Sequence, residues 1–488
     1  MARVTLSLIP DEPVDFNSGT ISLQSDVMLN TIRNLANNPL YKEEIQHRRR
    51  LLEDVTHRLI MGDEFLDVLT VPLRDHDGNF NLHYVLRLRK PEDFTVAESA
   101  KGGYYYSILA SADVRSADGK LIYRDEHKIA RDLAQSQLDD VKGKVFSFEG
   151  LLPLTPGKYK IAFELVNQLT NTGFHREVQV EVPNPGVSPL EVSNIVPFSS
   201  AKMTDRRNEA ASPFTGAGVS FVPLTGPETA LIQGQPLKFF YQVWAPSKLG
   251  GIHPDKKLEV TYVYGRMGDH ESNQTIHDEI PLNQLDSGGS IINGKQIPTA
   301  DLPQGNYRLA MTVRDPETGS KGFGSLTFSV STVSSATPSW DVTAPDAEPG
   351  RQEFQRAACY VANGDMSRAT QWLQLAYTRN PTNERFRDRL IQGYYQQKQY
   401  AEVVKVYSRS GLDDGTDEQT ILSIADSFAK TGDLKKAVAT MEAATNLKPS
   451  SGPLLLGLAE YYRQTGDMQK AAAAQQRGRQ LMSAVPAS

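Results

Sequence analysis

The chain has 488 residues, and at roughly 150 residues per domain this length predicts about three domains. Its 52 Lys and Arg against 58 Asp and Glu give a net charge of −6, which supplies no positive field for nucleic acid. We therefore expect no nucleic-acid partner. The single cysteine, Cys359, excludes a disulfide within the chain and any metal site built from several cysteines.

No apolar run reaches the ~20 residues of a membrane-crossing helix, so we expect no transmembrane segment. Residues 1–10 contain too short an apolar stretch for a secretory signal. The sequence alone therefore predicts a soluble protein without a signal peptide, although a processed chain would look the same.

Residues 1–65 predict a strand followed by helices that pack on the first β domain. Val4 to Ile9 is an apolar run, and residues 41–61 have apolar side chains at helical spacing. The run Arg48, Arg49 and Arg50 could form a basic recognition patch. On a helix these residues spread over about 200°, which favours a solvated face.

Residues 66–330 predict antiparallel β structure. Short runs of β-branched and aromatic residues, such as 80–88, 159–165 and 307–313, alternate with turn signals, and no long helical pattern separates them. This arrangement favours β-sandwiches over a parallel α/β sheet.

An internal repeat divides this β region into two domains, 66–183 and 190–330. Residues 154–163 match residues 302–311 at a constant offset of 148, which places Tyr159 opposite Tyr307. In both copies a glycine comes two residues before the tyrosine. We predict that the two tyrosines occupy equivalent places in two copies of one domain.

The glycine and tyrosine pattern resembles the corner of immunoglobulin-like sandwiches. That resemblance implies that the phenol hydroxyl bonds back to the loop backbone. Residues 331–349 are rich in Ser, Thr, Pro and Ala and have no sustained period, so we interpret them as a linker.

From residue 350 onward a period of 34 residues appears. It is carried by three columns: Tyr360, Tyr394, Phe428 and Tyr462; Ala369, Val403, Ala437 and Ala471; and Met366, Tyr400, Leu434 and Met468. These residues resemble the tetratricopeptide (TPR) family over 350–485, as four contiguous units. The second unit departs from the pattern, because Lys398 stands where the others have a turn glycine.

The resemblance implies an all-α solenoid at 350–488 that binds proteins on the concave wall formed by the first helix of each unit. Helical spacing places ten candidate protein-binding residues on that wall: Arg351, Arg385, Asp388, Gln392, Tyr395, Gln396, Asp426, Lys430, Glu460 and Arg463. Acidic residues interrupt the cationic clamp with which some members bind a terminal carboxylate. We therefore do not expect binding of chaperone tails.

Motifs of catalysis are missing from the sequence. The nine histidines are scattered, and the common hydrolase, nucleotide-binding and zinc-protease patterns are absent. Residues 75–79 superficially resemble a calcium loop, but Asp77-Gly78 between two strands favours a hairpin turn. Cys359 has no partner in the sequence that implies reactivity. We expect no enzymatic activity, cofactor or bound metal.

The order of parts has a second, weaker resemblance. Paired immunoglobulin-like domains followed by TPR units resemble bacterial proteins of the GWxTD type and their von Willebrand A-associated relatives. The Gly-Trp-x-Thr-Asp signature itself is absent. This resemblance implies a periplasmic or secreted location, with a cytoplasmic location as the alternative.

The sequence thus predicts a multidomain fold: two antiparallel immunoglobulin-like β-sandwiches followed by an all-α TPR solenoid. The predicted function is a structural, protein-interaction role, with the sandwiches as a rigid arm and the solenoid as docking surface. The final helix is expected to contact another subunit, as in a homo-oligomer, or a partner in a larger complex. The alternative is an envelope-associated or secreted carbohydrate-binding accessory protein, in which Trp244 or residues 104–106 form an exposed aromatic patch.

Overall fold

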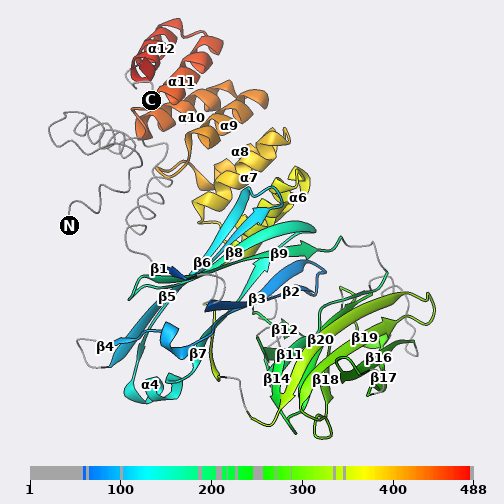
Figure 1. The fold of residues 1–488 in the computed structure, drawn as a ribbon. Coiled ribbons are helices and arrows are strands. Elements are labelled where there is room, and N and C mark those ends of the chain that lie inside the picture. Colours follow the sequence, from blue (N-terminus) through cyan, green and yellow to red (C-terminus); the bar gives the residue numbers. More distant parts are fainter. Residues whose placement is uncertain are drawn as a thin grey trace, which may run out of the picture. The chain divides into compact units, whose positions relative to one another are not determined.

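The computed structural model describes most of the chain after residue 58. The described residues are 59–61, 65–98, 103–184, 189–204, 212–216, 218–225, 229–245, 256–269, 272–286, 288–333, 337–344 and 348–483. All of them except Leu59 and Ile60 belong to one compact unit, Met61–Ser488. The helices predicted within residues 1–65 lie outside the described residues; strand β1 (Leu59–Met61) is described there. The described part is a β-rich region of several sheets followed by an all-α region (Figure 1).

The first β region has two sheets. One sheet has the order β9-β8-β5, with β4 and β6 both paired to β5, and the other has the order β2-β3-β7-β21. The bounds are β2 (Leu66–Arg74), β3 (Phe80–Leu88), β4 (Ala97–Glu98), β5 (Tyr104–Ser116), β6 (Leu121–Leu133), β7 (Val145–Pro153), β8 (Gly157–Asn167), β9 (Thr172–Val182) and β21 (Ser339–Thr343). A short helix, α4 (Gln135–Val141), follows β6.

One core joins these two sheets. Strand β8 alternates buried and partly buried residues, so one of its faces points inward. The ring of Phe163 on β8 lies 4.8 Å from that of Tyr84 on β3, centroid to centroid. Buried residues of both sheets belong to one hydrophobic cluster. The alternation noted in the sequence therefore places a layer of apolar side chains between the sheets.

The second β region also has two sheets. Their orders are β10-β15-β11-β13-β12, with β18 paired to β15, and β14-β20-β19-β16-β17. The bounds are β10 (Glu191–Val192), β11 (Val196–Met203), β12 (Thr215–Gly216), β13 (Val219–Pro223), β14 (Thr229–Ile232), β15 (Leu237–Trp244), β16 (Lys257–Arg266), β17 (Gln274–Pro281), β18 (Ser290–Ile297), β19 (Gly305–Arg314) and β20 (Lys321–Ser331). Tyr241 on β15 and Tyr262 on β16 join the two sheets, with their hydroxyl oxygens 2.6 Å apart.

The hairpins β8–β9 and β19–β20, which carry the predicted repeat, have the same register. Gly157 pairs with Val182, and at an offset of 148 Gly305 pairs with Val330. The corner bond is also common to both. The Tyr159 hydroxyl donates to the Thr155 carbonyl oxygen at 2.8 Å, and the Tyr307 hydroxyl donates to the carbonyl four residues earlier at 2.6 Å.

An apolar junction connects the two β regions. Its buried residues come from β2 and β3 on one side and from the sheet of β15 on the other, and they include Val71, Val85, Phe221 and Phe240. Polar contacts flank it. The Gln242 side-chain amide accepts from the Arg74 N–H at 2.7 Å and donates to the Arg74 carbonyl at 2.7 Å.

The interpretation of 331–349 as a linker is wrong for its central part. Residues Ser339–Thr343 form β21, which pairs in parallel with β7 of the first β region. Val342 is buried in the core of that region, and the ring of Trp340 lies 4.9 Å from that of Tyr106. Because few residues carry the strand, its alternation is too short to stand out among Ser, Thr and Pro. The chain thus returns to the first β region after completing the second.

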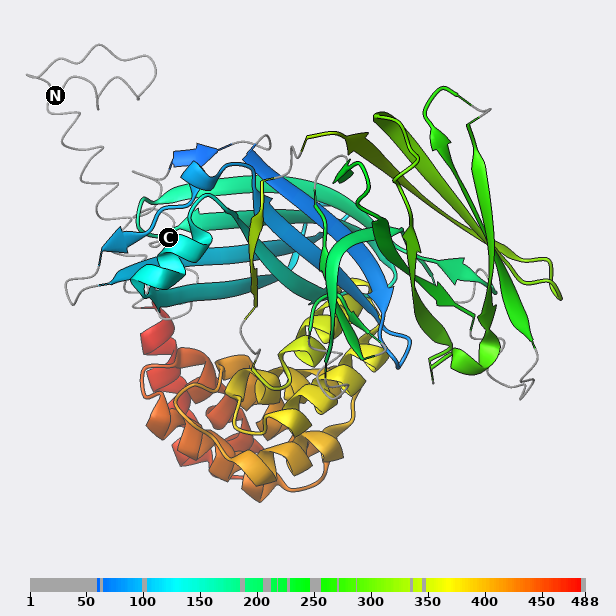
Figure 2. The ribbon, with the colours of Figure 1, turned by 90° about the horizontal axis from the view of Figure 1, so that it is seen from below.

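Eight helices follow in residues 348–483. Their bounds are α5 (Arg351–Ala362), α6 (Met366–Arg379), α7 (Glu384–Gln396), α8 (Tyr400–Ser410), α9 (Glu418–Lys430), α10 (Leu434–Leu447), α11 (Gly452–Gln464) and α12 (Met468–Ser483). The second helix of each pair begins 34 residues after the previous one, as the sequence period predicts. Helices α6 to α12 form a curved row of antiparallel neighbours (Figure 2).

The helix before this row, α5, packs on the first β region. The Arg356 guanidinium is buried there and donates to the carbonyl oxygens of Phe80 at 2.9 Å and Leu154 at 3.0 Å. Cys359 is fully buried in the core cluster of the same β region. Burial raises the pKa of its thiol to about 12, which favours an inert thiol. The helical row is therefore held directly by the β region.

Candidate functional site

A groove opens along the first helices of the helical pairs. It has a volume of about 570 Å³ and lies between α7, α9 and α11. Its lining includes Leu422, Leu434, Tyr461 and Asp426. A lining that combines apolar and polar side chains is the usual composition of a binding groove.

A glycine in the groove lining allows two neighbouring side chains to approach α11 closely. A Cβ atom added to Gly457 on α11 would lie 2.9 Å from the Met441 side chain and 3.0 Å from that of Leu422. A larger residue there would require the flexible ends of the Met441 and Leu422 side chains to shift.

Asp426 is the polar centre of the groove. It accepts a hydrogen bond from the Tyr395 hydroxyl at 3.0 Å. Burial, this bond and the negative charge raise the pKa of Tyr395 to about 12. Burial and the charge of Asp426 also raise the pKa of Tyr461. Both phenols therefore stay protonated at neutral pH; the Tyr395 proton is donated to Asp426, and the Tyr461 hydroxyl can donate to a partner.

Charged groups of both signs lie at the edge of the groove. Glu460 is exposed and pairs with Arg463. Lys430 is exposed too, and no acidic side chain of the described residues pairs with it. The groove thus offers two carboxylates, Asp426 and Glu460, and one unpaired ammonium group to a partner.

The structure brings four of the ten predicted wall residues together at this groove: Tyr395, Asp426, Lys430 and Glu460. Four more lie on the same first helices without lining it: Arg385, Gln392, Gln396 and Arg463. Among these, Gln392 donates to Ser423 at 3.2 Å, and Arg385 lies over the Phe354 ring at 4.9 Å.

Two predicted wall residues have other roles. Arg351 donates to the Asp125 carboxylate of β6 at 2.6 Å, so it belongs to the contact between α5 and the β region. Asp388 is buried and accepts from the Arg387 guanidinium at 2.8 Å. Helical spacing places both on the first helices, but it does not show which face the β region or the next helix covers.

Sequence reasoning missed the groove residues Tyr461, Leu422 and Gly457. The 34-residue period identified Tyr462 as a member of the aromatic column, but it gave no separate signal for the adjacent Tyr461. Gly457 stands where the repeat has Ser423 and Arg389, one and two periods earlier. A glycine within a helical pattern was the available signal for a close approach.

Comparison with known proteins supports the assignment of the helices. The family model for the tetratricopeptide repeat matches residues 419–451, which span α9 and α10. The chain therefore contains a TPR repeat in its C-terminal region, and such repeats are protein-interaction modules.

Several solved structures of MamA are similar to this chain. MamA MSR-1 is 19% identical over 28% of this chain and 78% of its own, with a TM-score of 0.24. MamA AMB-1 is 20% identical over 28% and 82%, with a TM-score of 0.25. MamA 41-end from Desulfovibrio magneticus RS-1 is 16% identical over 28% and 78%, with a TM-score of 0.25. No curated protein matches the chain in sequence.

Two further observations concern the described residues alone. Within them, no three His, Cys, Asp or Glu side chains gather closely enough to hold a metal ion. No helix in the same ranges has the length and apolar character that spanning a membrane requires.

Proposed function

We propose that this protein is a non-enzymatic interaction protein, in which the helical repeats bind a partner protein within a larger assembly. In this proposal the two β regions are immunoglobulin-like sandwiches that act as a rigid arm. The observation that carries it is the open groove on α7, α9 and α11.

The groove suits one helix or extended segment of a partner. Its apolar lining residues, Leu422, Leu434 and Tyr461, can contact apolar side chains of a partner. Asp426 and Glu460 would bind basic side chains or backbone N–H groups, and Lys430 would bind an acidic one. We therefore propose a partner segment that is amphipathic and carries both basic and acidic residues.

Direct packing supports the role of a rigid arm. The apolar junction around Phe240 fixes the second β region on the first, and buried Arg356 fixes α5 on the first. A groove carried by such a body keeps its orientation when a partner binds, which limits the entropy lost on association.

The carbohydrate-binding alternative has less support at the residues on which it rested. Trp244 is 8% exposed and lies under the Arg74 guanidinium, 3.4 Å from the ring centroid. Within residues 104–106, Tyr106 is 1% exposed, whereas Tyr105 is 37% exposed. Trp244 and Tyr106 therefore offer no flat aromatic surface to a sugar, and Tyr105 offers one partly exposed ring. An extracytoplasmic location remains part of our proposal, on the strength of the order of domains.

Site-specific photo-crosslinking in the native host tests this function. A photoreactive residue replaces Gln419, which is exposed and lines the groove. A matched control carries it at Lys435, which is exposed on the second helix of the same pair and does not line the groove. We expect one discrete protein adduct from position 419 that is absent from position 435.

The double change Asp426→Asn and Lys430→Gln sharpens this experiment. Both replacements keep the side-chain size and remove the charges, so we expect the adduct at position 419 to fall about tenfold while the fold is kept. Equal adducts from both positions, or an adduct that the double change leaves intact, would rule out the groove as the binding surface.

A further inference from the structure

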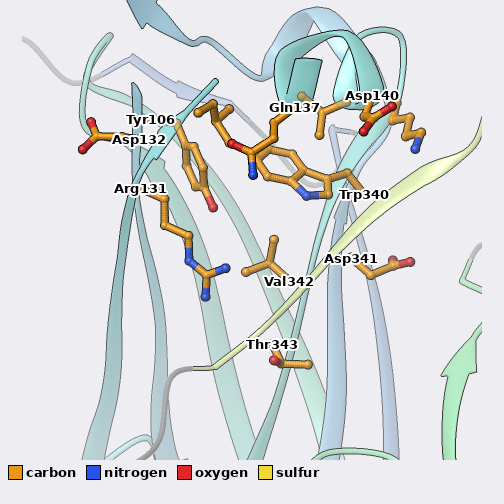
Figure 3. A pocket seen from close by; sticks show the side chains of 12 residues that line it. Tyr106, Arg131, Asp132, Gln137, Asp140, Trp340, Asp341, Val342 and Thr343 are labelled. Carbon is orange, nitrogen blue, oxygen red and sulfur yellow. The ribbon is translucent and has the colours of Figure 1, made fainter. Parts of the chain in front are cut away.

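A second pocket lies in the first β region, away from the helical groove. It has a volume of about 400 Å³ and is lined by the end of β6, by α4 and by β21 (Figure 3). Trp340 of β21 forms part of its wall. The proposed function does not use this pocket.

Three hydrogen-bond donors in this pocket lack acceptors within the described ranges. The Tyr106 hydroxyl is buried and makes no hydrogen bond, although its residue is only 1% exposed. The Trp340 ring nitrogen has no acceptor among the described groups, and neither does the exposed Arg131 guanidinium. A buried hydroxyl without a partner is costly, which makes this group a candidate for ligand binding.

The donors face a common space. Figure 3 shows the Tyr106 hydroxyl, the Trp340 ring nitrogen and the Arg131 guanidinium around the Val342 side chain. The rings of Tyr106 and Trp340 are 4.9 Å apart. The charge of Arg131 also lies near enough to oppose the rise that burial causes in the pKa of Tyr106.

The rest of the lining is apolar inside and acidic at the rim. Leu133, Val141 and Val342 supply the apolar walls. The carboxylates of Asp132 and Asp341 turn away from the donors (Figure 3). The centre of the pocket is therefore rich in donors, whereas negative charge lies around it.

We propose that this pocket binds a small monocarboxylic acid with an apolar body. The carboxylate accepts from Arg131, Tyr106 and Trp340, and the apolar body lies against Val342 and Leu133. An Arg–carboxylate contact is among the stronger hydrogen bonds, and two further donors fix its orientation.

The lining selects against other ligand classes. A cation would face Arg131 and Lys144, neither of which has a counter-ion among the described residues. A phosphate dianion carries twice the charge of a carboxylate, so the acidic rim, to which Asp132 and Asp140 belong, would repel it about twice as strongly. A neutral amide would leave the guanidinium without an opposite charge.

Ligand-detected NMR and calorimetry on the full chain test the proposal with phenylacetate as the probe. Phenylacetamide, which has the same shape without the charge, is the matched ligand control. We expect saturable binding of phenylacetate, with a dissociation constant in the range of about 0.01–1 mM, and at least about tenfold weaker binding of the amide.

Three variants locate the site. Arg131→Gln and Tyr106→Phe are each expected to weaken phenylacetate binding by about tenfold. Tyr106→Phe should leave the unfolding midpoint of the free protein unchanged or raised, because the hydroxyl it removes has no partner. Lys142→Gln removes a nearby exposed cation that does not line the pocket and should leave binding unchanged.

Three outcomes would overturn the proposal. The first is no saturable binding of phenylacetate up to about 10 mM. The second is equal binding of acid and amide, or binding that neither Arg131→Gln nor Tyr106→Phe weakens. The third is binding of a peptide with a C-terminal carboxylate, N-acetyl-Gly-Phe, in the absence of phenylacetate binding, which would assign the pocket to a chain end instead of a small acid.

Discussion

The β regions and the helices both show internal repetition, at offsets of 148 and 34 residues, and in both the first copy contacts a neighbouring domain. In the β regions the Tyr159 corner lies beside α5, where Asn363 donates to Thr155 at 3.1 Å. In the helices Arg356 of the first pair stands where later pairs have Leu390, Ile424 and Leu458. Repetition thus explains local structure, and the departure at Arg356 marks a contact between domains.

The largest effect is expected for Arg356→Ala, which removes the buried contact between the first helical pair and the first β region. The change removes three buried hydrogen bonds, to the Phe80 and Leu154 carbonyls and to the Asn81 side chain; the Phe80 carbonyl keeps the Leu154 N–H as a donor. We expect a loss of about 4 kcal/mol in the free energy of unfolding, measured by urea denaturation. Arg385→Ala is the control. Because Arg385 is exposed, this change should lower the free energy of unfolding by less than about 1 kcal/mol. Equal losses would contradict the special role of the first pair.

The junction of the two β regions predicts a dependence on pH. Burial lowers the pKa of His83 to about 4, from the 6.5 of an unperturbed histidine, and its Nδ1 accepts from the Phe214 N–H at 2.8 Å. Between pH 6.5 and pH 4 the unfolded state takes up a proton that the folded state refuses. Stability should therefore fall by up to about 3 kcal/mol as the pH drops through this range.

Glu149 acts in the opposite sense. Burial and the charge of Asp341 raise its pKa to about 8, so the folded state holds a proton that the unfolded state loses above pH 4.5. Its contribution is present below pH 4.5 and is lost as the pH rises through 8. Urea denaturation across pH 4–9 should show His83→Gln flattening the acid limb and Glu149→Gln the alkaline limb. Unchanged limbs in these variants would contradict this assignment.

The two corner tyrosines sharpen the comparison between the β copies. Tyr159→Phe removes bonds to both the carbonyl and the hydroxyl of Thr155 in a buried site beside α5. We expect a loss of about 2 kcal/mol, against about 1 kcal/mol for Tyr307→Phe, which removes one bond. Equal costs in thermal unfolding would show that α5 adds nothing to the first corner.

The smallest effect is expected at Lys398, a departure that serves no contact between domains. Its φ angle is +59°, in the left-handed region that the turn glycines Gly364, Gly432 and Gly466 occupy in the other pairs. Lys398→Gly should stabilise the protein by about 0.5–1 kcal/mol, because it removes strain at the backbone. The reverse change, Gly432→Lys, should destabilise it by a similar amount. Opposite signs in urea denaturation would contradict this explanation.

Periodicity was sufficient to predict the repeats but not their contacts. The 34-residue period predicted where the second helices begin, and the offset of 148 predicted that Tyr159 and Tyr307 occupy equivalent places. Strand β21 was not predicted, because five residues are too few to show a clear alternation of apolar and polar side chains. The pocket lined by Trp340 depends on that strand, so it was not predicted either. The change from Leu to Arg at Arg356 was visible, but its meaning depends on a β surface that periodicity does not describe.

The central claim is that the helical repeats are fixed on the β regions rather than joined by a flexible linker. Spin labels at Lys158→Cys on β8 and Lys405→Cys on α8, both exposed, measure this in the full chain, since buried Cys359 should not react. Pulsed dipolar spectroscopy should give one narrow distance distribution, which Arg356→Ala broadens. A broad distribution in the chain that keeps Arg356 would contradict the account.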